Sequence, residues 1–243
     1  MSRNKATVHS TTEAPNHPPR FDNDDTIQSS SSSMATQSDT SLLLDTVHYA
    51  AVAHQNQKRK SPGQAPYIQH PIDVARRIAG AGSSLAGNAP IHVLQAALLH
   101  DVIEDCDLTA QDVEERFGPV VTKIVLECSD DKSLNKQQRK QAQIDHAPHK
   151  SREAAHVKLA DKLSNLTDLT RPGGMPIGWT VHRVQEYFVW AKKVTDAIDS
   201  AANPGLSAQL HQLYKEASFE HKGKRYKAHP EWPQGTDLWE QPL

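Results

Sequence analysis

The segment LLHDVIEDC, residues 98–106, places four polar side chains on a helix that is otherwise built for burial. His100 and Glu104 are four residues apart, as are Asp101 and Asp105, so in one helix they form two adjacent columns. A buried carboxylate without a partner is costly, or its pKa shifts until it is neutral. The cluster therefore needs a cation, which is either a bound divalent metal or a Lys or Arg from a neighbouring helix. Taken alone, the segment favours the second interpretation.

Two further segments supply side chains of the same kind. In YIQHP, His70 directly precedes a proline that starts a helix, a loop-edge position from which an imidazole can reach a site or merely cap the helix. In VKLADKLSNLTDL, Asp161 lies in an otherwise apolar helix, where an ion pair with Lys158 or Lys162 would also explain it. Together the His and Asp side chains form a ligand set without sulfur. Such a set suits manganese, iron or zinc with positions left open for water and substrate.

The middle of the chain predicts one all-α domain. Helical segments follow one another from Ser41, the expected first N-cap, and Pro71 and Pro90 are each expected to open a helix. Gly118 ends one helix directly before the next. There is no alternating strand pattern and no Asn-Gly or Asp-Gly hairpin signal. We therefore expect a single helical bundle over residues 41–218.

The two ends of the chain differ from this body. Residues 1–40 include SSSSS, several Thr and one aromatic, so they cannot bury enough apolar surface to offset their chain entropy. We expect this segment to be disordered. Residues 219–243 contain two Trp and three Pro, and the sequence assigns them no structure.

The overall composition excludes several classes of partner. A net charge of −2 gives no electrostatic footprint for nucleic acid or an anionic membrane surface. The two cysteines have no CxxC spacing, which argues against a disulfide framework or a thiolate zinc site. The sequence shows neither a secretory signal nor an apolar run of membrane-spanning length. A soluble, cytoplasmic protein that binds neither nucleic acid nor membrane is expected.

Four strings occur in an order that resembles a known family: YIQHPIDVA, LQAALLHDVIED, VKLADKLSNL and HRVQEYFVWA. They are similar to the hydrolase domain of the RelA/SpoT alarmone enzymes, which are HD-domain phosphohydrolases. The likeness covers about residues 42–200 and is greatest to the small stand-alone form found in metazoa. It implies an HD-domain helical bundle that hydrolyses guanosine 3′,5′-bis(diphosphate) (ppGpp) to GDP and pyrophosphate with Mn²⁺. The chain has no room for a synthetase domain, so hydrolysis without synthesis is expected.

The resemblance also implies roles for particular side chains. The Mn²⁺ ion would be held by His70, His100, Asp101 and Asp161. Glu104 and Asp105 would orient or deprotonate the attacking water. The nucleotide would be contacted by Arg59, Lys60, Lys136, Asn165, Arg183 and Tyr187. Ser164 departs from the family pattern, because a larger ring is common at its position, and this difference would alter the fit of the nucleotide.

Two other functions stay open at this point. One is hydrolysis of a different nucleotide that carries a phosphate on its ribose, such as removal of the 2′-phosphate of NADPH. The other is a non-catalytic nucleotide-binding module that has kept the fold. The complete ligand set and the intact Glu104–Asp105 pair argue against the second of these.

Overall fold

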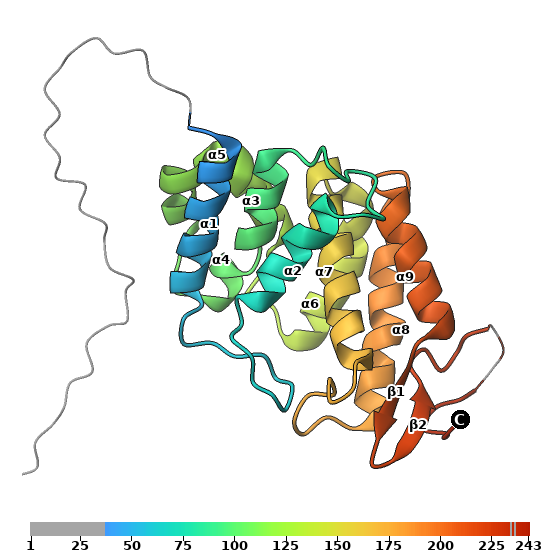
Figure 1. The fold of residues 1–243 in the computed structure, drawn as a ribbon. Helices are drawn as coiled ribbons and strands as arrows, with labels where there is room; N and C mark the ends of the chain where they lie inside the picture. Colours follow the sequence, from blue (N-terminus) through green and yellow to red (C-terminus); the bar gives the residue numbers. More distant parts are fainter. Residues whose placement is uncertain (1–36, 234, 236) are drawn as a thin grey trace, which may run out of the picture. The chain divides into compact units, whose positions relative to one another are not determined.

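The structure is a computed structural model that describes residues 37–233, 235 and 237–243. Helices form its body, as Figure 1 shows. They are α1 (Asp39–Ala53), α2 (Gln69–Ala79), α3 (Ile91–Leu99), α4 (Val102–Asp105), α5 (Ala110–Cys128), α6 (Lys136–His146), α7 (Arg152–Thr170), α8 (Val181–Ala197) and α9 (Pro204–Glu216), with a 3-10 turn at Ala147–His149. The prediction of an all-α bundle is confirmed, apart from one small β-hairpin near the C-terminal end.

The start of α1 differs from the expected one. Its N-cap is Ser38, whose hydroxyl accepts a hydrogen bond from the Ser41 N–H at 3.2 Å, so the prediction of Ser41 as the cap is wrong. Both serines are suitable cap residues, and the sequence alone did not separate them. The predicted disorder of residues 1–40 concerns a segment that lies, up to residue 36, outside the described residues.

The helix that carries the HD dipeptide is broken at that dipeptide. α3 ends at Leu99, His100 and Asp101 form a turn, and α4 begins at Val102. The expectation of one continuous helix with two columns of polar groups is therefore wrong. The Asp105 N–H still donates to the Asp101 carbonyl oxygen at 2.8 Å, so α4 follows the turn closely. The break lies at the point where two polar side chains leave the apolar helix.

The predicted junction at Gly118 is confirmed. Gly118 has a φ of 80°, a backbone conformation that favours glycine, and it divides α5 into two helical halves. Pro119 begins the second half, where its missing N–H and fixed φ are tolerated.

Helix α7 is the centre of the bundle. It packs against α2, α3, α5, α8 and α9, and it is buried on nearly every side, with Leu159, Leu163 and Leu166 in the core. Ser151 caps its start by accepting a hydrogen bond from the Ala154 N–H at 3.2 Å. A helix held on this many sides provides a rigid support for the polar side chains that it carries.

A hairpin of β1 (Ser218–His221) and β2 (Lys224–Lys227) follows α9. Lys222 and Gly223, with φ values of 51° and 72°, form a two-residue turn of the kind that joins short antiparallel strands. This Lys-Gly turn lacks the Asn-Gly or Asp-Gly signal, so the sequence did not predict the strands. The end of β2 and described residues beyond it pack on α8, where the buried Gln185 donates to the carbonyl oxygens of Lys227 and Leu238.

Among the described residues, no helix combines the length and the apolar character that crossing a membrane requires.

Candidate metal centre

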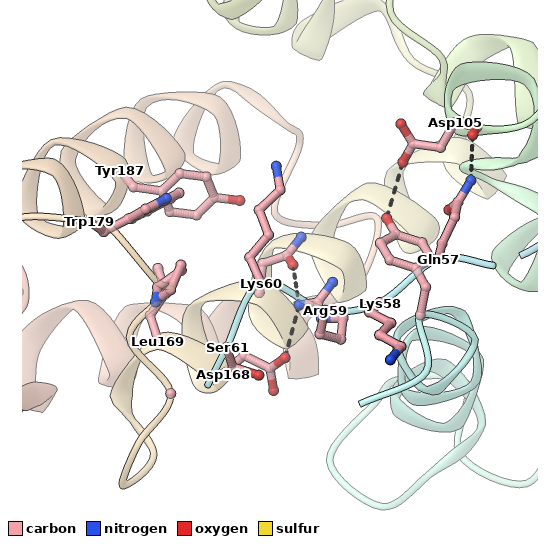
Figure 2. Close-up of a pocket in the computed structure, with 14 residues that line it drawn as sticks. Gln57, Lys58, Arg59, Lys60, Ser61, Asp105, Asp168, Leu169, Trp179 and Tyr187 are labelled. Atoms are coloured by element: carbon pink, nitrogen blue, oxygen red, sulfur yellow. Dashed lines mark hydrogen bonds and ion pairs between the residues drawn. The ribbon is translucent and has the colours of Figure 1, made fainter. Parts of the chain in front are cut away.

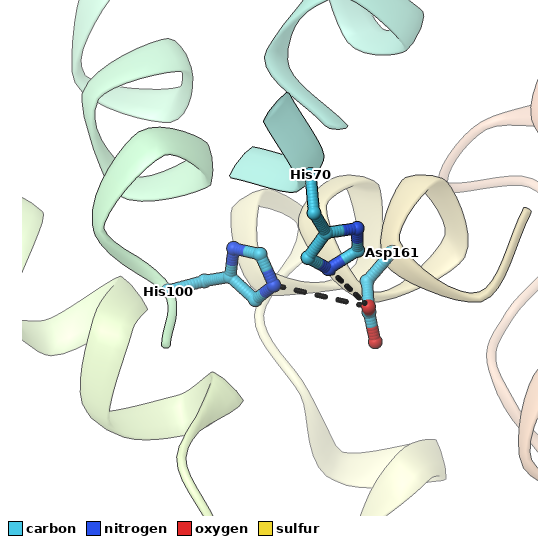
Figure 3. A group of neighbouring side chains, drawn as sticks. All are labelled: His70, His100 and Asp161. Carbon is cyan, nitrogen blue, oxygen red and sulfur yellow. Dashed lines mark ion pairs between the residues drawn. The ribbon is translucent and has the colours of Figure 1, made fainter. Parts of the chain in front are cut away.

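Three buried side chains from separate parts of the bundle converge on one point, as Figure 3 shows. His70 comes from the first turn of α2, His100 from the turn after α3, and Asp161 from the middle of α7. Their potential ligand atoms all lie within 4.8 Å of one another. Asp161 Oδ1 is 3.3 Å from His70 Nε2 and 3.8 Å from His100 Nε2. The fold therefore brings together three of the four predicted metal ligands.

Asp101, the fourth predicted ligand, lies at the edge of this group. Its Oδ2 is 3.2 Å from His100 Nε2 and 3.7 Å from His70 Nε2. Its side chain is 16% exposed, whereas those of the two histidines are almost fully covered. Asp101 is thus positioned to complete the ligand set from the side that faces solvent.

The orientation of His100 fits a bound cation. Its Nδ1 lies 2.8 Å from the Ala97 carbonyl oxygen, which can only accept, so Nδ1 carries the hydrogen and Nε2 has the lone pair when the ring is neutral. Nε2 is buried and, within the part of the chain that the structure describes, has no hydrogen-bond partner. A lone pair that faces two carboxylates is repelled unless a metal ion or a proton lies between them. This donor set of imidazole nitrogens and carboxylate oxygens suits a divalent metal.

Electrostatics within the site point to the same requirement for positive charge. Burial lowers the pKa of His100, but the adjacent Asp101 and Asp161 outweigh it and raise this pKa to about 9. Burial likewise raises the pKa of Asp161, whereas Lys162 and the two imidazoles hold it well below its usual range. Lys162 Nζ lies 3.1 Å from Asp161 Oδ2, so the ion pair considered as an alternative is also present. It engages one carboxylate oxygen, while the other faces the imidazoles.

Tyr67 connects a candidate metal ligand, Asp101, to the neighbouring Asp105, and the sequence did not predict this role. Its hydroxyl lies 2.6 Å from Asp101 Oδ2 and 3.3 Å from Asp105 Oδ2. Burial raises the pKa of Tyr67 well above its ordinary value, so the hydroxyl stays protonated. It donates a hydrogen bond to Asp101. Its position as the first residue of the string YIQHP was the signal that could have identified it.

The two predicted catalytic carboxylates lie in different surroundings. Glu104 is half-buried and accepts a hydrogen bond from the Asp130 N–H. Burial raises the pKa of Glu104 to about 7, against the opposing effect of Lys158. Asp105 is exposed and points into the adjoining pocket, as Figure 2 shows. A carboxylate with a pKa near neutrality can accept a proton from water at physiological pH.

A pocket of about 480 Å³ adjoins the centre. It reaches the ligands through Tyr67, which contacts Asp101, and Asn165, whose Nδ2 lies 2.6 Å from Asp161 Oδ1. Four of the six predicted substrate contacts line it, namely Arg59, Lys60, Asn165 and Tyr187. The rest of the lining includes Lys58, Asp168, Leu169 and Trp179. A cavity with several cations and aromatic rings beside a metal centre suits a nucleotide.

Arg59 is held in place at the floor of this pocket. Its guanidinium lies 2.9 Å from Asn165 Oδ1 and 2.8 Å from Asp168 Oδ2, and 5.6 Å from the centre of the Tyr67 ring. These contacts join the loop before α2 to the face of α7 (Figure 2). The pairing of Asp168 with Arg59 was not predicted from the sequence.

The other two predicted contacts lie outside the pocket lining. Arg183 is exposed and lies 4.3 Å above the ring of Trp179, so it borders the pocket through that ring. Lys136 is exposed at the start of α6 and does not line the pocket. Trp179 was missed because it follows the Gly-rich segment RPGGMPIG, where helical periodicity gives no information.

Comparison with known proteins agrees with this geometry. The model of the HD domain family matches residues 46–174. The proteins named guanosine-3′,5′-bis(diphosphate) 3′-pyrophosphohydrolase MESH1 from Danio rerio and Homo sapiens are 47% and 48% identical over 179 residues, which span 74% of this chain and 96% of each relative. A solved structure described as a metazoan orthologue of SpoT that hydrolyses ppGpp is 43% identical, covers 74% of this chain and 97% of its own, and has a TM-score of 0.67. The chain therefore belongs to the HD-domain family, among its small SpoT-like members.

Proposed function

We propose that this protein hydrolyses ppGpp to GDP and pyrophosphate, with one Mn²⁺ ion held by His70, His100, Asp101 and Asp161. The observation that carries the proposal is the convergence of three buried ligands, one with an orphaned Nε2, beside a cationic pocket. The names of the MESH1 relatives, which match over nearly their whole length, supply the substrate. Manganese is the metal that the family resemblance implies, and the donor set accepts it.

The metal and the side chains of the protein have different roles in the proposed reaction. A divalent cation bound there would lower the pKa of an attacking water molecule and polarise a phosphoryl oxygen. The water oxygen bonds to the phosphorus attached to the ribose O3′, and the bond from that phosphorus to O3′ breaks. Glu104 accepts the proton that the water loses. A proton from solvent goes to O3′, which completes GDP, and pyrophosphate leaves. The Tyr67 hydroxyl contacts both the Asp101 and the Asp105 carboxylates, and it fixes their positions during the reaction.

The substrate carries several negative charges, and the pocket supplies cations for them. Lys58, Arg59 and Lys60 are consecutive in the chain and all line the pocket. Trp179 and Tyr187, whose ring centres are 5.9 Å apart, provide flat apolar surface for a base or a ribose. Local positive charge explains how a chain of nearly zero net charge can bind a polyanion.

Removal of one pocket cation tests this arrangement. Arg59→Ala is expected to raise the KM for ppGpp by about tenfold to 100-fold, since a hydrogen bond to a charged group contributes about 1.5–3 kcal/mol. Steady-state kinetics measures the effect, and Arg116→Ala, which removes an exposed arginine outside the pocket lining, is the matched control. An unchanged KM in Arg59→Ala would remove Arg59 from the binding site.

The pH dependence of the reaction tests Glu104 as the base. Its carboxylate must be ionised to accept a proton, so kcat/KM should fall as pH drops through the pKa of Glu104. Burial sets this pKa at about 7 in the metal-free protein, with Asp130 and Asp101 adding to the increase and Lys158 opposing it. A bound cation lowers it further. We expect an acidic limb at or below pH 7 but above the ordinary carboxylate range of about 4.

Lys158→Met should move this limb to higher pH by about one unit, because it removes the cation that favours the ionised form of Glu104. A pH–rate profile of both proteins at constant ionic strength measures the shift. A limb that stays in place, or moves to lower pH, would contradict the assignment of Glu104.

A competition between substrates tests the proposed specificity. The metal-loaded protein is supplied separately with ppGpp and with NADPH, and ion-exchange chromatography separates the products. We expect GDP and pyrophosphate from ppGpp, with a higher kcat/KM than for release of phosphate from NADPH. A higher kcat/KM for NADPH would reassign the substrate while leaving the metal centre intact.

A further inference from the structure

His70 has a second ring nitrogen, which points away from the candidate metal centre. Its Nδ1 lies 3.2 Å from the hydroxyl oxygen of Ser164, and both residues are buried. Ser164 lies on α7, nearly one turn after Asp161. One rigid helix therefore supplies both a metal ligand and the hydrogen-bond partner of another ligand. In metal sites, such partners fix which nitrogen of an imidazole is left to bind the metal.

The direction of this hydrogen bond depends on Asp73. Asp73 lies one turn after His70 on α2, and Asp73, Ser164 and His70 together line a cavity of about 320 Å³ between α2 and α7. Burial raises the pKa of Asp73, but hydrogen bonds from Arg77, Arg76 and Ser164 outweigh it and lower this pKa to about 2. Asp73 is therefore ionised at neutral pH and can only accept hydrogen bonds.

An acceptor-only Asp73 determines the rest of the chain of hydrogen bonds. The ionised Asp73, which shares a cavity with Ser164, attracts the single hydrogen of the Ser164 hydroxyl. The Ser164 oxygen therefore offers a lone pair to His70 Nδ1, 3.2 Å away. Nδ1 must then carry a hydrogen, and the lone pair of the neutral imidazole is on Nε2. That atom is 3.3 Å from Asp161 Oδ1 and 3.7 Å from Asp101 Oδ2, on the side of the candidate metal.

We propose that Ser164 and Asp73 are positioning residues that hold His70 in the tautomer and ring orientation needed to bind the metal. This inference rests on the metal centre of the proposed function. His100 obtains the same result from the backbone carbonyl of Ala97, which no substitution removes. His70 depends on two side chains, and it is therefore the ligand whose geometry a single substitution can disturb.

The small side chain of residue 164 leaves space in the cavity beside Asp73. Serine stands where the family resemblance leads to the expectation of a larger ring, and its small side chain lines the cavity that Asp73 shares. A ring at this position would fill space that the Ser164 hydroxyl uses to connect α7 to Asp73.

Ser164→Ala tests the proposal, and Thr167→Val is its matched control. Thr167 lines the same cavity from the same helix, but its hydroxyl donates to the Leu163 carbonyl oxygen at 2.6 Å and does not contact His70. Ser164→Thr restores a hydroxyl. Two quantities are measured: the Mn²⁺ dissociation constant by titration calorimetry, and the His70 tautomer from its side-chain ¹⁵N shifts in the metal-free protein at alkaline pH.

We expect Ser164→Ala to weaken Mn²⁺ binding by about tenfold to 100-fold, the usual effect of removing such a partner. It should also give a mixture of His70 tautomers, while Ser164→Thr and Thr167→Val keep the wild-type tautomer and affinity. Asp73→Ala should give the same mixture as Ser164→Ala. Wild-type affinity together with a single tautomer in Ser164→Ala would overturn the proposal. Neither readout requires turnover, so a wild-type protein that binds Mn²⁺ without cleaving ppGpp would refute the proposed function and leave this inference standing.

Discussion

Asp161→Ala is expected to lose bound Mn²⁺ and ppGpp hydrolysis together. Asp161 Oδ1 lies within 4 Å of both imidazoles, and Asp161 is more buried than Asp101, the other carboxylate that does so. It comes from the central helix of the bundle. Without it, the two histidines face only Asp101 at the solvent edge of the site. Because loss of a supporting partner already costs about tenfold to 100-fold in such sites, loss of a ligand should lower kcat/KM by at least about 1000-fold.

Metal content after desalting and kcat/KM are measured on the same samples of the Asp161 variant. Removal of the Asp161 side chain leaves Lys162 buried without its partner, which destabilises the fold. Asp161→Asn is therefore measured as a second variant, because it preserves the volume of the side chain. Asp145→Ala removes an exposed aspartate of α6 and is the control. A folded Asp161 variant that retains Mn²⁺ at wild-type stoichiometry would show that the metal lies elsewhere.

Glu104→Gln is expected to lose rate while keeping the metal. The glutamine amide cannot accept a proton from water, and a positioned general base contributes about 100-fold to 10,000-fold. Its carbonyl oxygen can still accept the hydrogen bond from the Asp130 N–H, so the loop before α6 should stay in place. The expected result is therefore a fall in kcat of that size with unchanged Mn²⁺ content.

Asp105→Asn and Glu114→Gln complete this experiment. Asp105 is the neighbouring acid that lines the pocket, whereas Glu114 is an exposed residue of α5 and serves as the control. Full activity in Glu104→Gln with a large loss in Asp105→Asn would transfer the role of base to Asp105. Full activity in both variants would exclude the pair from the chemistry.

The sequence predicted the parts of the site that can be recognised from the type of a single residue. His70, His100 and Asp161 are unusual because they are polar groups in apolar helices, and burial of such groups requires a counter-charge. Their presence in three separate strings predicted them as candidate ligands. Spacing along the chain could not show that the strings meet, because their meeting depends on how α2, α3 and α7 pack.

Two features could not be predicted from residue types alone, the break after Leu99 and the contacts of Tyr67, because both depend on local geometry. Helix α3 ends at Leu99 although residues 91–105 contain no glycine or proline, so helix-breaking residues do not account for the break. Tyr67 was overlooked because an aromatic residue beside a proline is usually part of the core, and only its hydroxyl contacts reveal its role. Lys136 lies outside the pocket lining, so its contact with the nucleotide stays a prediction.

One assay of the metal-stripped protein tests metal-dependent ppGpp hydrolysis most directly. Purified protein is freed of metal with a chelator, supplied with ppGpp, and assayed before and after Mn²⁺ is restored, with ion-exchange chromatography to identify the products. We predict no turnover without metal, and equal amounts of GDP and pyrophosphate once Mn²⁺ is added. Full hydrolysis in the metal-free protein, or no hydrolysis with Mn²⁺ bound, would contradict the claim that these side chains form a metal-dependent ppGpp hydrolase centre.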